Sequence, residues 1–285
     1  MEGKIIKNIS NAYTVLCDNK EYVCTPRGVF RNKNITPLVG DICKIDEKNN
    51  IITEIMPRKN VLDRPSISNV DYALLVTSLK EPRLSLNLLD REISSVILSH
   101  IKPIICFTKL DLLSDKELDE LDDITNYYEK IGIPVFLNTD IDALVKFLKG
   151  SIVVLTGQSG AGKSTLLNKI KPELNLKTSE ISYALNRGKH TTRHTQIFNI
   201  KGIWFCDTPG FSSLILNKYT KEEIKSSFTE FKNYPCMYDD CMHVKEKDCS
   251  VKEAIDKGYI MLSRYENYKK ILEDIDGNSR FVFKK

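Results

Sequence analysis

The chain has 285 residues, 41% of them hydrophobic and 28% charged, with a formal net charge of +4; this is the composition of an ordinary globular protein, and the length predicts two or three domains. No apolar run approaches the roughly 20 residues that a membrane-spanning helix needs, and the first residues show no secretory signal, so we expect a cytoplasmic protein without membrane association. Residues 151–217 carry eight basic and three acidic side chains, an excess that suits a polyphosphate ligand and a nucleic-acid surface, although solvated lysines on helices are an equally good explanation.

Residues 1–60 are predicted to form five short β-strands, at 4–9, 13–18, 22–25, 41–45 and 51–55, separated by Asn, Asp, Gly and Pro. Five strands in so short a segment indicate a small barrel, for which the OB-type fold is the natural candidate. Barrels of this type often bind nucleic acid, but a fold alone does not establish a function.

Residues 61–217 alternate between apolar strands and helices. Strands are predicted at 71–78, 103–108, 134–137, 151–156, 196–200 and 203–206, and helices at 85–99, 115–130, 142–148 and from residue 163. This alternation is typical of an α/β domain.

Residues 218–285 are polar, and their clearest predicted helices are 252–256 and 259–274. Before these helices, Cys236, Cys241, His243 and Cys249 have the spacing C-x4-C-x-H-x5-C. Three thiolates and one imidazole form a closed tetrahedral set, which indicates one structural Zn²⁺; three unrelated free thiols are the alternative. Because the stretch that carries these ligands, residues 236–249, has few apolar residues and no core of its own, we expect the metal to supply much of its folding free energy.

A phosphate-binding loop follows the strand predicted at 151–156. The next eight residues fit G-x-x-x-x-G-K-[ST], and a helix is predicted to begin at Lys163. The glycines let successive N–H groups face the phosphates, Lys163 acts as a catalytic residue by neutralising phosphate charge, and Ser164 is expected to bind Mg²⁺. The residues expected to bind the nucleotide here are Gly157, Gln158, Ser159, Gly160, Ala161, Gly162, Lys163, Ser164 and Thr165.

Thr108, Lys109 and Asp111 form a T-K-x-D element at the end of the strand predicted at 103–108. The Asp111 carboxylate can accept hydrogen bonds from the ring N–H and the exocyclic amine of guanine, whereas adenine offers no such pair of donors. An unmatched buried carboxylate costs about 1–3 kcal/mol, so the element favours GTP over ATP. Alone the tetrapeptide could be a helix cap, but together with the phosphate loop it indicates a GTP-binding protein.

Asp207 and Gly210 belong to a D-x-x-G element directly after the strand predicted at 203–206. The aspartate is expected to hold Mg²⁺ through water and the glycine N–H to contact the γ-phosphate, although a turn after a strand is the alternative. The basic loop 187–194 before it can order around Mg²⁺ and the γ-phosphate. We expect Thr192 to be the second protein ligand of Mg²⁺, because Thr-Arg resembles the switch threonine of Era-like GTPases, with Thr191 as the second choice.

Phe211 stands just after D-x-x-G, where Ras-like enzymes carry a glutamine that orients the attacking water. Intrinsic hydrolysis should therefore be slow. His190 is our first candidate for a catalytic residue in place of the glutamine and His194 the second, although each could instead bind phosphate, RNA or solvent.

The order of these elements differs from that of ordinary GTPases, because the base element precedes the phosphate loop by about 50 residues. This order indicates a circular permutation, which a parallel sheet tolerates since the site requires only that strand ends meet in space. The D-x-x-G element then leads directly into residues 218–285, so we expect the nucleotide state to move that segment.

The strand-rich N-terminal segment, the permuted elements T-K-x-D, G-x-x-x-x-G-K-S, H-T-T-R-H and D-T-P-G-F, and the cysteine cluster together resemble the ribosome small-subunit-dependent GTPase A (RsgA) family over essentially the whole chain. The resemblance implies an OB-type barrel at 1–60, a circularly permuted P-loop GTPase domain at 61–217 and a helical zinc-binding domain at 218–285. The family often has Asn at the position of Thr108, and residues 137–139, with Asn138 at their centre, match only loosely its S-A-K element, which supports the guanine.

The same resemblance implies partners and an activity. A member of this family would bind the small ribosomal subunit and its rRNA during late maturation, and would hydrolyse GTP to GDP and phosphate under strong stimulation by that subunit. We expect a monomer. Three other functions stay open: an RNA-binding assembly scaffold that nucleotide merely stabilises, a permuted GTPase of the large subunit, and a redox sensor that uses the zinc thiolates.

Overall fold

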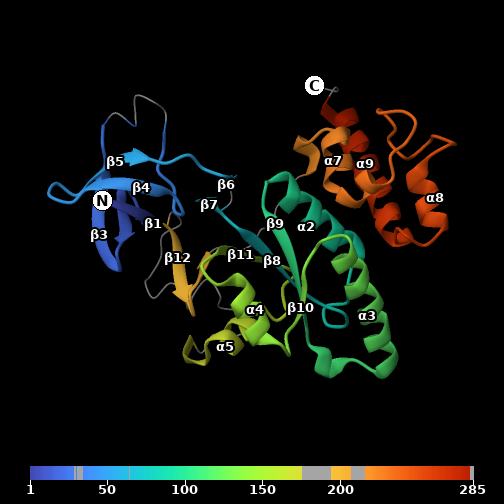
Figure 1. Cartoon of the computed structure of the whole chain (residues 1–285), viewed down its shortest axis with the longest axis horizontal. Coiled ribbons are helices and arrows are strands. Elements are labelled where there is room, and N and C mark those ends of the chain that lie inside the picture. Colours follow the sequence, from blue (N-terminus) through green and yellow to red (C-terminus); the bar gives the residue numbers. More distant parts are fainter. Residues whose placement is uncertain (29, 31–34, 64, 175–193, 207–215, 283–285) are drawn as a thin grey trace.

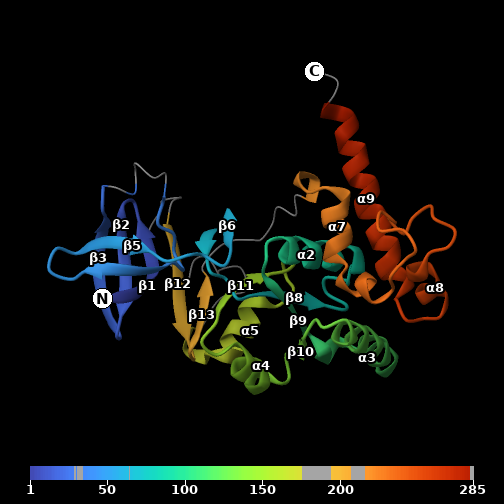
Figure 2. The same ribbon diagram turned by 45° about the horizontal axis from the view of Figure 1, so that its top comes forward.

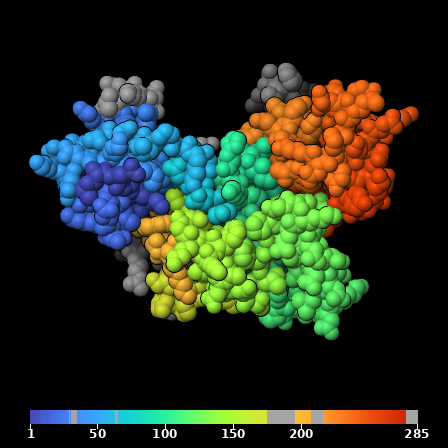
Figure 3. All heavy atoms as spheres, viewed as in Figure 1, coloured from blue at the N-terminus to red at the C-terminus, as the bar shows by residue number. Residues whose placement is uncertain are grey.

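The computed structural model describes residues 1–28, 30, 35–63, 65–174, 194–206 and 216–282. Figure 1 shows a barrel at one end, an α/β domain in the middle and a helical C-terminal region at the other end, and the space-filling view in Figure 3 shows the same order. No helix of the described part is long and apolar enough to cross a membrane.

The N-terminal barrel is closed. Its strands are β1 (Glu2–Ile9), β2 (Ala12–Cys17), β3 (Lys20–Pro26), β4 (Ile42–Asp46) and β5 (Ile51–Ile55). They neighbour one another in the order β1-β2-β3-β5-β4, and β1 also pairs with β4, which completes the ring. In β2, Tyr13, Val15 and Cys17 are buried while the residues between them are half-buried, the period of two expected of a barrel strand. The predicted OB-type barrel is confirmed.

The central sheet carries the α/β domain. Its strands, in spatial order, are β10 (Val135–Leu137), β9 (Lys102–Thr108), β8 (Tyr72–Ser78), β11 (Ile152–Thr156), β13 (Ile203–Cys206) and β12 (His194–Ile200). All neighbours are parallel except β12, which runs antiparallel to β13. In chain order the sheet grows from β8 outward to β10 and then returns to β11 on the other side, so the direction of growth reverses between β8 and β11. Ligands of open α/β sheets bind beyond the carboxyl ends of the strands at such a reversal.

Helices cover both faces of this sheet. On one face lie α2 (Leu86–Leu98) and α3 (Asp115–Lys130), and on the other α4 (Ile141–Leu148) and α5 (Lys163–Ile170). Successive residues of β8 alternate between them, since Leu75 packs in the core under α2 and α3 while Leu74 and Val76 pack in the core under α4 and α5. The predicted α/β class is confirmed, and the short helices η1 (Leu110–Leu112) and η2 (Pro172–Leu174) follow β9 and α5.

The barrel and the central sheet are joined edge to edge. Strand β1 pairs antiparallel with β12, with Lys7 opposite Gln196 and Ile9 opposite His194, so that eleven strands form one hydrogen-bonded sheet. A hairpin of β6 (Val61–Asp63) and β7 (Ser66–Ser68) lies at the junction and bridges to the barrel through Ile67 and Val39. Neither the pairing nor the hairpin was predicted from the sequence.

The C-terminal region contains η3 (Leu216–Lys218), α7 (Lys221–Ser227), η4 (Thr229–Asn233), α8 (Ser250–Asp256) and α9 (Leu262–Val282), and Figure 2 shows α9 beside α7. It has an apolar core in which Phe228 and Phe231 stack and the Tyr268 ring packs edge-on against both. The sequence analysis did not predict this core, because its aromatic residues are spread thinly along the sequence and converge only between the helices.

A buried ionic cluster joins the C-terminal region to α2. Arg264 of α9 is fully buried and donates hydrogen bonds to Asp90 of α2 at 2.6 Å and to Glu230 at 2.8 Å. Asp90 also accepts from Tyr128 of α3 and from Asn267 of α9, each at 2.7 Å. Because a buried charge without partners costs several kcal/mol, this pairing fixes the position of α9 against the helices of the α/β domain.

Candidate nucleotide site and candidate zinc site

The phosphate loop connects β11 to α5 and packs tightly against β8 and β9. Gly157 has a φ of 129°, and a Cβ at this position would lie 2.0 Å from the carbonyl oxygen of Val76. Gly162 caps α5 with a φ of 91°, and a Cβ there would lie 3.3 Å from Thr108 Oγ1. Only glycine fits at Gly157, since a β-carbon would collide with the backbone of β8.

Lys163 lies in the first turn of α5 and curls back over the loop. Its Nζ donates to the carbonyl oxygens of Gly157 at 2.6 Å and Gln158 at 2.7 Å. Burial lowers the pKa of Lys163, an effect that nearby Glu92 partly offsets. The side chain of Ser164 is buried beside the helix N-terminus, where backbone N–H groups favour anions. The loop therefore combines an ammonium group with a helix N-terminus, as a polyphosphate ligand requires.

Thr108 ties the base element to the phosphate loop. Its hydroxyl donates to the carbonyl oxygen of Ala161 at 2.6 Å, and Thr108 Oγ1 also lies 3.1 Å from the carbonyl oxygen of Thr77. Lys109, the next residue, has left-handed backbone angles and caps η1. Residues that are 53 positions apart in sequence are thus brought together where the sequence predicted one site.

Beside this contact lies an open pocket of about 280 Å³, close to the lower end of the range for small-molecule sites, about 300–1,000 Å³. Asp111 is exposed at the pocket, whereas Asn138 is buried and donates its backbone N–H to the carbonyl of Phe107 at 2.8 Å. The lining residues are Thr108, Lys109, Asp111, Leu112, Asn138, Gly162, Thr165 and Lys169. The base element, the loosely matching segment at Asn138 and the start of α5 therefore share one cavity.

Lys169 of α5 was not predicted as a site residue. Its Nζ donates to the carbonyl oxygen of Asn138 at 3.1 Å. The sequence could have indicated Lys169 by its spacing from the predicted site residue Thr165, since residues four apart lie on the same face of a helix.

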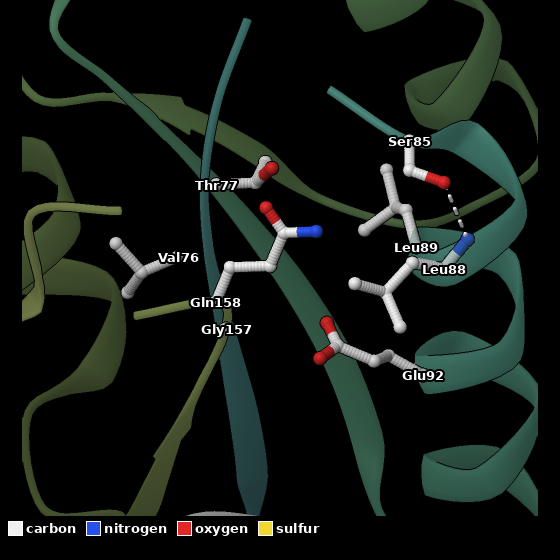
Figure 4. A pocket seen from close by; sticks show the side chains of 8 residues that line it. All are labelled: Val76, Thr77, Ser85, Leu88, Leu89, Glu92, Gly157 and Gln158. Atoms are coloured by element: carbon white, nitrogen blue, oxygen red, sulfur yellow. Dashed lines mark hydrogen bonds between the residues drawn. The ribbon is translucent and has the colours of Figure 1, made fainter. Parts of the chain in front are cut away.

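A second pocket lies between the phosphate loop and α2 (Figure 4). Glu92 of α2 is buried, and its carboxylate points across this pocket toward Gly157 and Gln158, with Thr156 Oγ1 at 3.5 Å. Burial raises the pKa of Glu92 to about 7, although Lys163 and Thr156 act in the opposite direction. Sequence analysis missed Glu92, because nothing in the pattern of α2 shows that this carboxylate faces the loop.

Several predicted site residues lie outside the described residues. They are His190, Thr191, Thr192, Asp207, Gly210 and Phe211. The backbone of His194 is described, and it begins β12 opposite Ile9 of the barrel.

The four candidate zinc ligands converge in the C-terminal region, with all ligand atoms within 4.8 Å of one another. His243 Nδ1 lies 3.3 to 3.5 Å from the three sulfur atoms, and Cys249 Sγ lies 3.8 Å from Cys236 Sγ and 4.0 Å from Cys241 Sγ. Tetrahedral zinc with ordinary bond lengths separates two sulfurs by about 3.8 Å and a sulfur from a nitrogen by about 3.6 Å. The donor set therefore fits Zn²⁺ in kind, number and spacing.

The loop that carries these ligands is anchored to α9 and α7. Tyr265 Oη donates to the carbonyl of His243 at 2.7 Å, and Tyr268 Oη donates to the carbonyl of Met242 at 2.8 Å. Lys225 Nζ donates to the carbonyl of Cys241 at 3.1 Å. These bonds hold the backbone between the ligands, as the outer contacts of metal sites commonly do.

A parallel sheet with a phosphate loop after one strand, a T-K-x-D element after a neighbouring strand and the reversed chain order defines a circularly permuted P-loop GTPase. Comparison with known proteins agrees. The family model "RsgA N-terminal domain" matches residues 2–53, and the model "RsgA GTPase" matches residues 55–217. The chain belongs to the RsgA GTPase family and is accordingly a GTP hydrolase.

Similar proteins match along nearly their full length. "Small ribosomal subunit biogenesis GTPase RsgA" of Enterococcus faecalis is 42% identical over 100% of this chain and 98% of its own. The protein of the same name from Bacillus velezensis is 44% identical over 96% of this chain and 97% of its own. The crystal structure of YjeQ from Thermotoga maritima has a TM-score of 0.85 at 33% identity, covering 97% of this chain and 98% of that one. YloQ, described as a circularly permuted GTPase, has a TM-score of 0.83 at 35% identity, covering 97% and 95%.

Proposed function

We propose that this GTPase acts in small ribosomal subunit biogenesis, binding the small subunit and its rRNA during late maturation. The subunit in turn stimulates hydrolysis of GTP to GDP and phosphate. The proposal is supported by relatives of that name at 42% and 44% identity over nearly their whole length. For the nucleotide site, the observation that carries the proposal is the contact between Thr108 and Ala161, which unites the base element and the phosphate loop.

Within this site, we assign the base to Asp111 and the phosphates to residues 157–165. Asp111 accepts from the guanine N–H groups, the stem of Lys109 lies along the base, and Lys163 neutralises the terminal phosphates. Mg²⁺, which offsets phosphate charge in such sites, would be held by Ser164 and Thr192, with Asp207 acting through water. In this assignment, the Gly210 N–H contacts the γ-phosphate, and His190 orients the attacking water.

We further propose that Cys236, Cys241, His243 and Cys249 hold one structural Zn²⁺. The spacing of their donor atoms supports this ion. The domain boundaries that we propose are 1–60, 61–217 and 218–285. We propose a cytoplasmic monomer that does not bind membranes.

Multiple-turnover GTP hydrolysis, measured for the protein alone, with purified small subunits and with purified large subunits, tests the function. We expect slow turnover alone and with large subunits, and stimulation by small subunits within the range of about 10³–10⁵ that activators give related GTPases. Lys163→Ala serves as the control and should abolish the stimulated rate. Stimulation by large subunits alone would identify a large-subunit factor, and absence of turnover in all three mixtures would leave the RNA-binding scaffold.

A further inference from the structure

The two edges of guanine need different partners in the proposed base pocket. Its ring N–H and exocyclic amine are donors and suit the carboxylate of Asp111. The opposite edge presents two acceptors, O6 and N7, and requires a donor from the protein. The residue that supplies this donor is a second determinant of base specificity, and the T-K-x-D element does not name it.

Three hydrogen-bond donors in or near the pocket are already committed elsewhere. The single hydroxyl proton of Thr108 points to the carbonyl of Ala161 at 2.6 Å, and the backbone N–H of Asn138 donates to Phe107 at 2.8 Å. The ammonium of Lys163 lies over the phosphate loop, bonded to Gly157 and Gln158. None of these three donors is directed to the base.

Lys169 has the required chemistry and position. It lines the pocket from α5, and the carbonyl of Asn138 holds its Nζ at 3.1 Å. An ammonium has three protons, so two remain after this bond. Thr165 is the other α5 residue that lines the pocket, and it lies one helical turn nearer the phosphate loop.

We propose that the ammonium of Lys169, positioned by the Asn138 carbonyl, donates a hydrogen bond to the O6 and N7 edge of guanine. This inference rests on the proposed nucleotide site and adds a residue to it. Adenine keeps the N7 acceptor but has an amine donor in place of O6, so a bond from Lys169 to O6 would disfavour adenine, as Asp111 does at the other edge. The side-chain amide of Asn138 is the rival donor.

The test is equilibrium binding of three diphosphates to the wild-type protein and to Lys169→Met. The ligands are GDP, the 2-aminopurine riboside analogue, which lacks O6 and with it the N1 proton, and the 7-deazaguanosine analogue, which lacks N7. For each ligand the loss is the ratio of the variant's dissociation constant to that of the wild-type protein. A charge-assisted hydrogen bond predicts that Lys169→Met binds GDP about ten- to a hundredfold more weakly. The loss should shrink to about threefold or less for the analogue that lacks the accepting atom.

Two further variants make the result specific. Lys171→Met removes the same charge from the C-terminal cap of α5, outside the pocket lining, and should leave all three affinities unchanged. Lys169→Arg should restore most of the GDP affinity, which excludes a folding defect as the cause. Equal losses for all three ligands, or no loss at all, would overturn the role of Lys169. If instead the wild-type protein bound ADP as well as GDP, the proposed nucleotide site itself would be wrong.

Discussion

At the scale of single residues, Glu92 is the least expected feature near the nucleotide site. A carboxyl group beneath the phosphate loop opposes phosphate binding when it is charged, yet its burial raises its pKa to about 7. It therefore gains its charge close to neutral pH, and the charge of Lys163 beside it partly compensates. When bound phosphates interact with the Lys163 ammonium, its charge stabilises the Glu92 carboxylate less. Glu92 then favours its protonated, neutral form.

Glu92→Gln should stabilise the protein in a pH-dependent way. The folded pKa of about 7 lies above the ordinary value of 4.5, so the folded state prefers the protonated carboxyl. Compared with Glu92→Gln, the wild-type protein therefore has its highest free energy of unfolding below pH 4.5. This free energy falls as the pH rises through 7 and the buried carboxyl becomes charged. Urea unfolding at pH 8 should show Glu92→Gln more stable by on the order of 2–3 kcal/mol, with the difference nearly gone at pH 4.5.

Glu120→Gln on the exposed side of α3 is the matched control and should change the free energy of unfolding by less than about 0.5 kcal/mol at either pH. A stability difference for Glu92→Gln that is the same at both pH values would contradict the raised pKa.

Sequence reasoning at this scale recovered residues that belong to short motifs. Thr108, Lys109 and Asp111 were placed in one site with Gly162 before any geometry was known, and all four line the same pocket. Glu92 and Lys169 were missed because each is an ordinary helix residue in sequence. Their proximity to the site depends on how α2 and α5 pack, which local patterns do not specify.

At the scale of elements, the loop of residues 236–249 carries the four candidate zinc ligands. The order of this zinc loop depends more on the bound metal than that of any other described segment of the chain. Bonds from Tyr265 and Tyr268 attach the loop to α9, while the aromatic core of Phe228 and Phe231 holds the helices together. Because this core exists, metal removal should loosen the loop without unfolding the whole region.

We expect one zinc ion per chain in protein purified without added metal, measured by elemental analysis. Chelation should speed amide hydrogen exchange in residues 236–249, while α9 and the central sheet stay protected. Cys249→Ser should reproduce this change without chelator, whereas serine in place of the non-ligand Cys206 should not. Purified protein with neither zinc nor iron would argue against the site.

The positions of most helices and strands could be predicted from hydrophobic periodicity. The strand predicted at 51–55 and the helix predicted at 115–130 have the bounds expected for them. The last helix begins at Leu262 and runs to Val282, later at both ends than the predicted 259–274. The β6–β7 hairpin and the pairing of β1 with β12 were missed because they rest on short or non-local pairings that alternation within one segment does not reveal.

At the scale of the whole molecule, both flanking parts are attached to the α/β domain close to nucleotide elements. The barrel pairs with β12, the strand that follows the predicted switch loop, and α9 is fixed to α2 through Arg264 and Asp90. Helix α2 also carries Glu92, so the helix that anchors the C-terminal region borders the phosphate loop. A partner that holds the barrel and the C-terminal region together would constrain the elements around the nucleotide from both sides.

The central claim is that elements in permuted order along the chain form one guanine-nucleotide site. Its most direct test is the binding of GDP and xanthosine diphosphate to the wild-type protein and to Asp111→Asn, with Asp115→Asn on the exposed first turn of α3 as the control. An asparagine amide can donate to the 2-oxygen of xanthine, which the aspartate carboxylate repels. We predict that Asp111→Asn weakens GDP binding and strengthens binding of xanthosine diphosphate, each by about tenfold or more, while Asp115→Asn changes neither. Unchanged affinity of Asp111→Asn for both ligands would contradict the account.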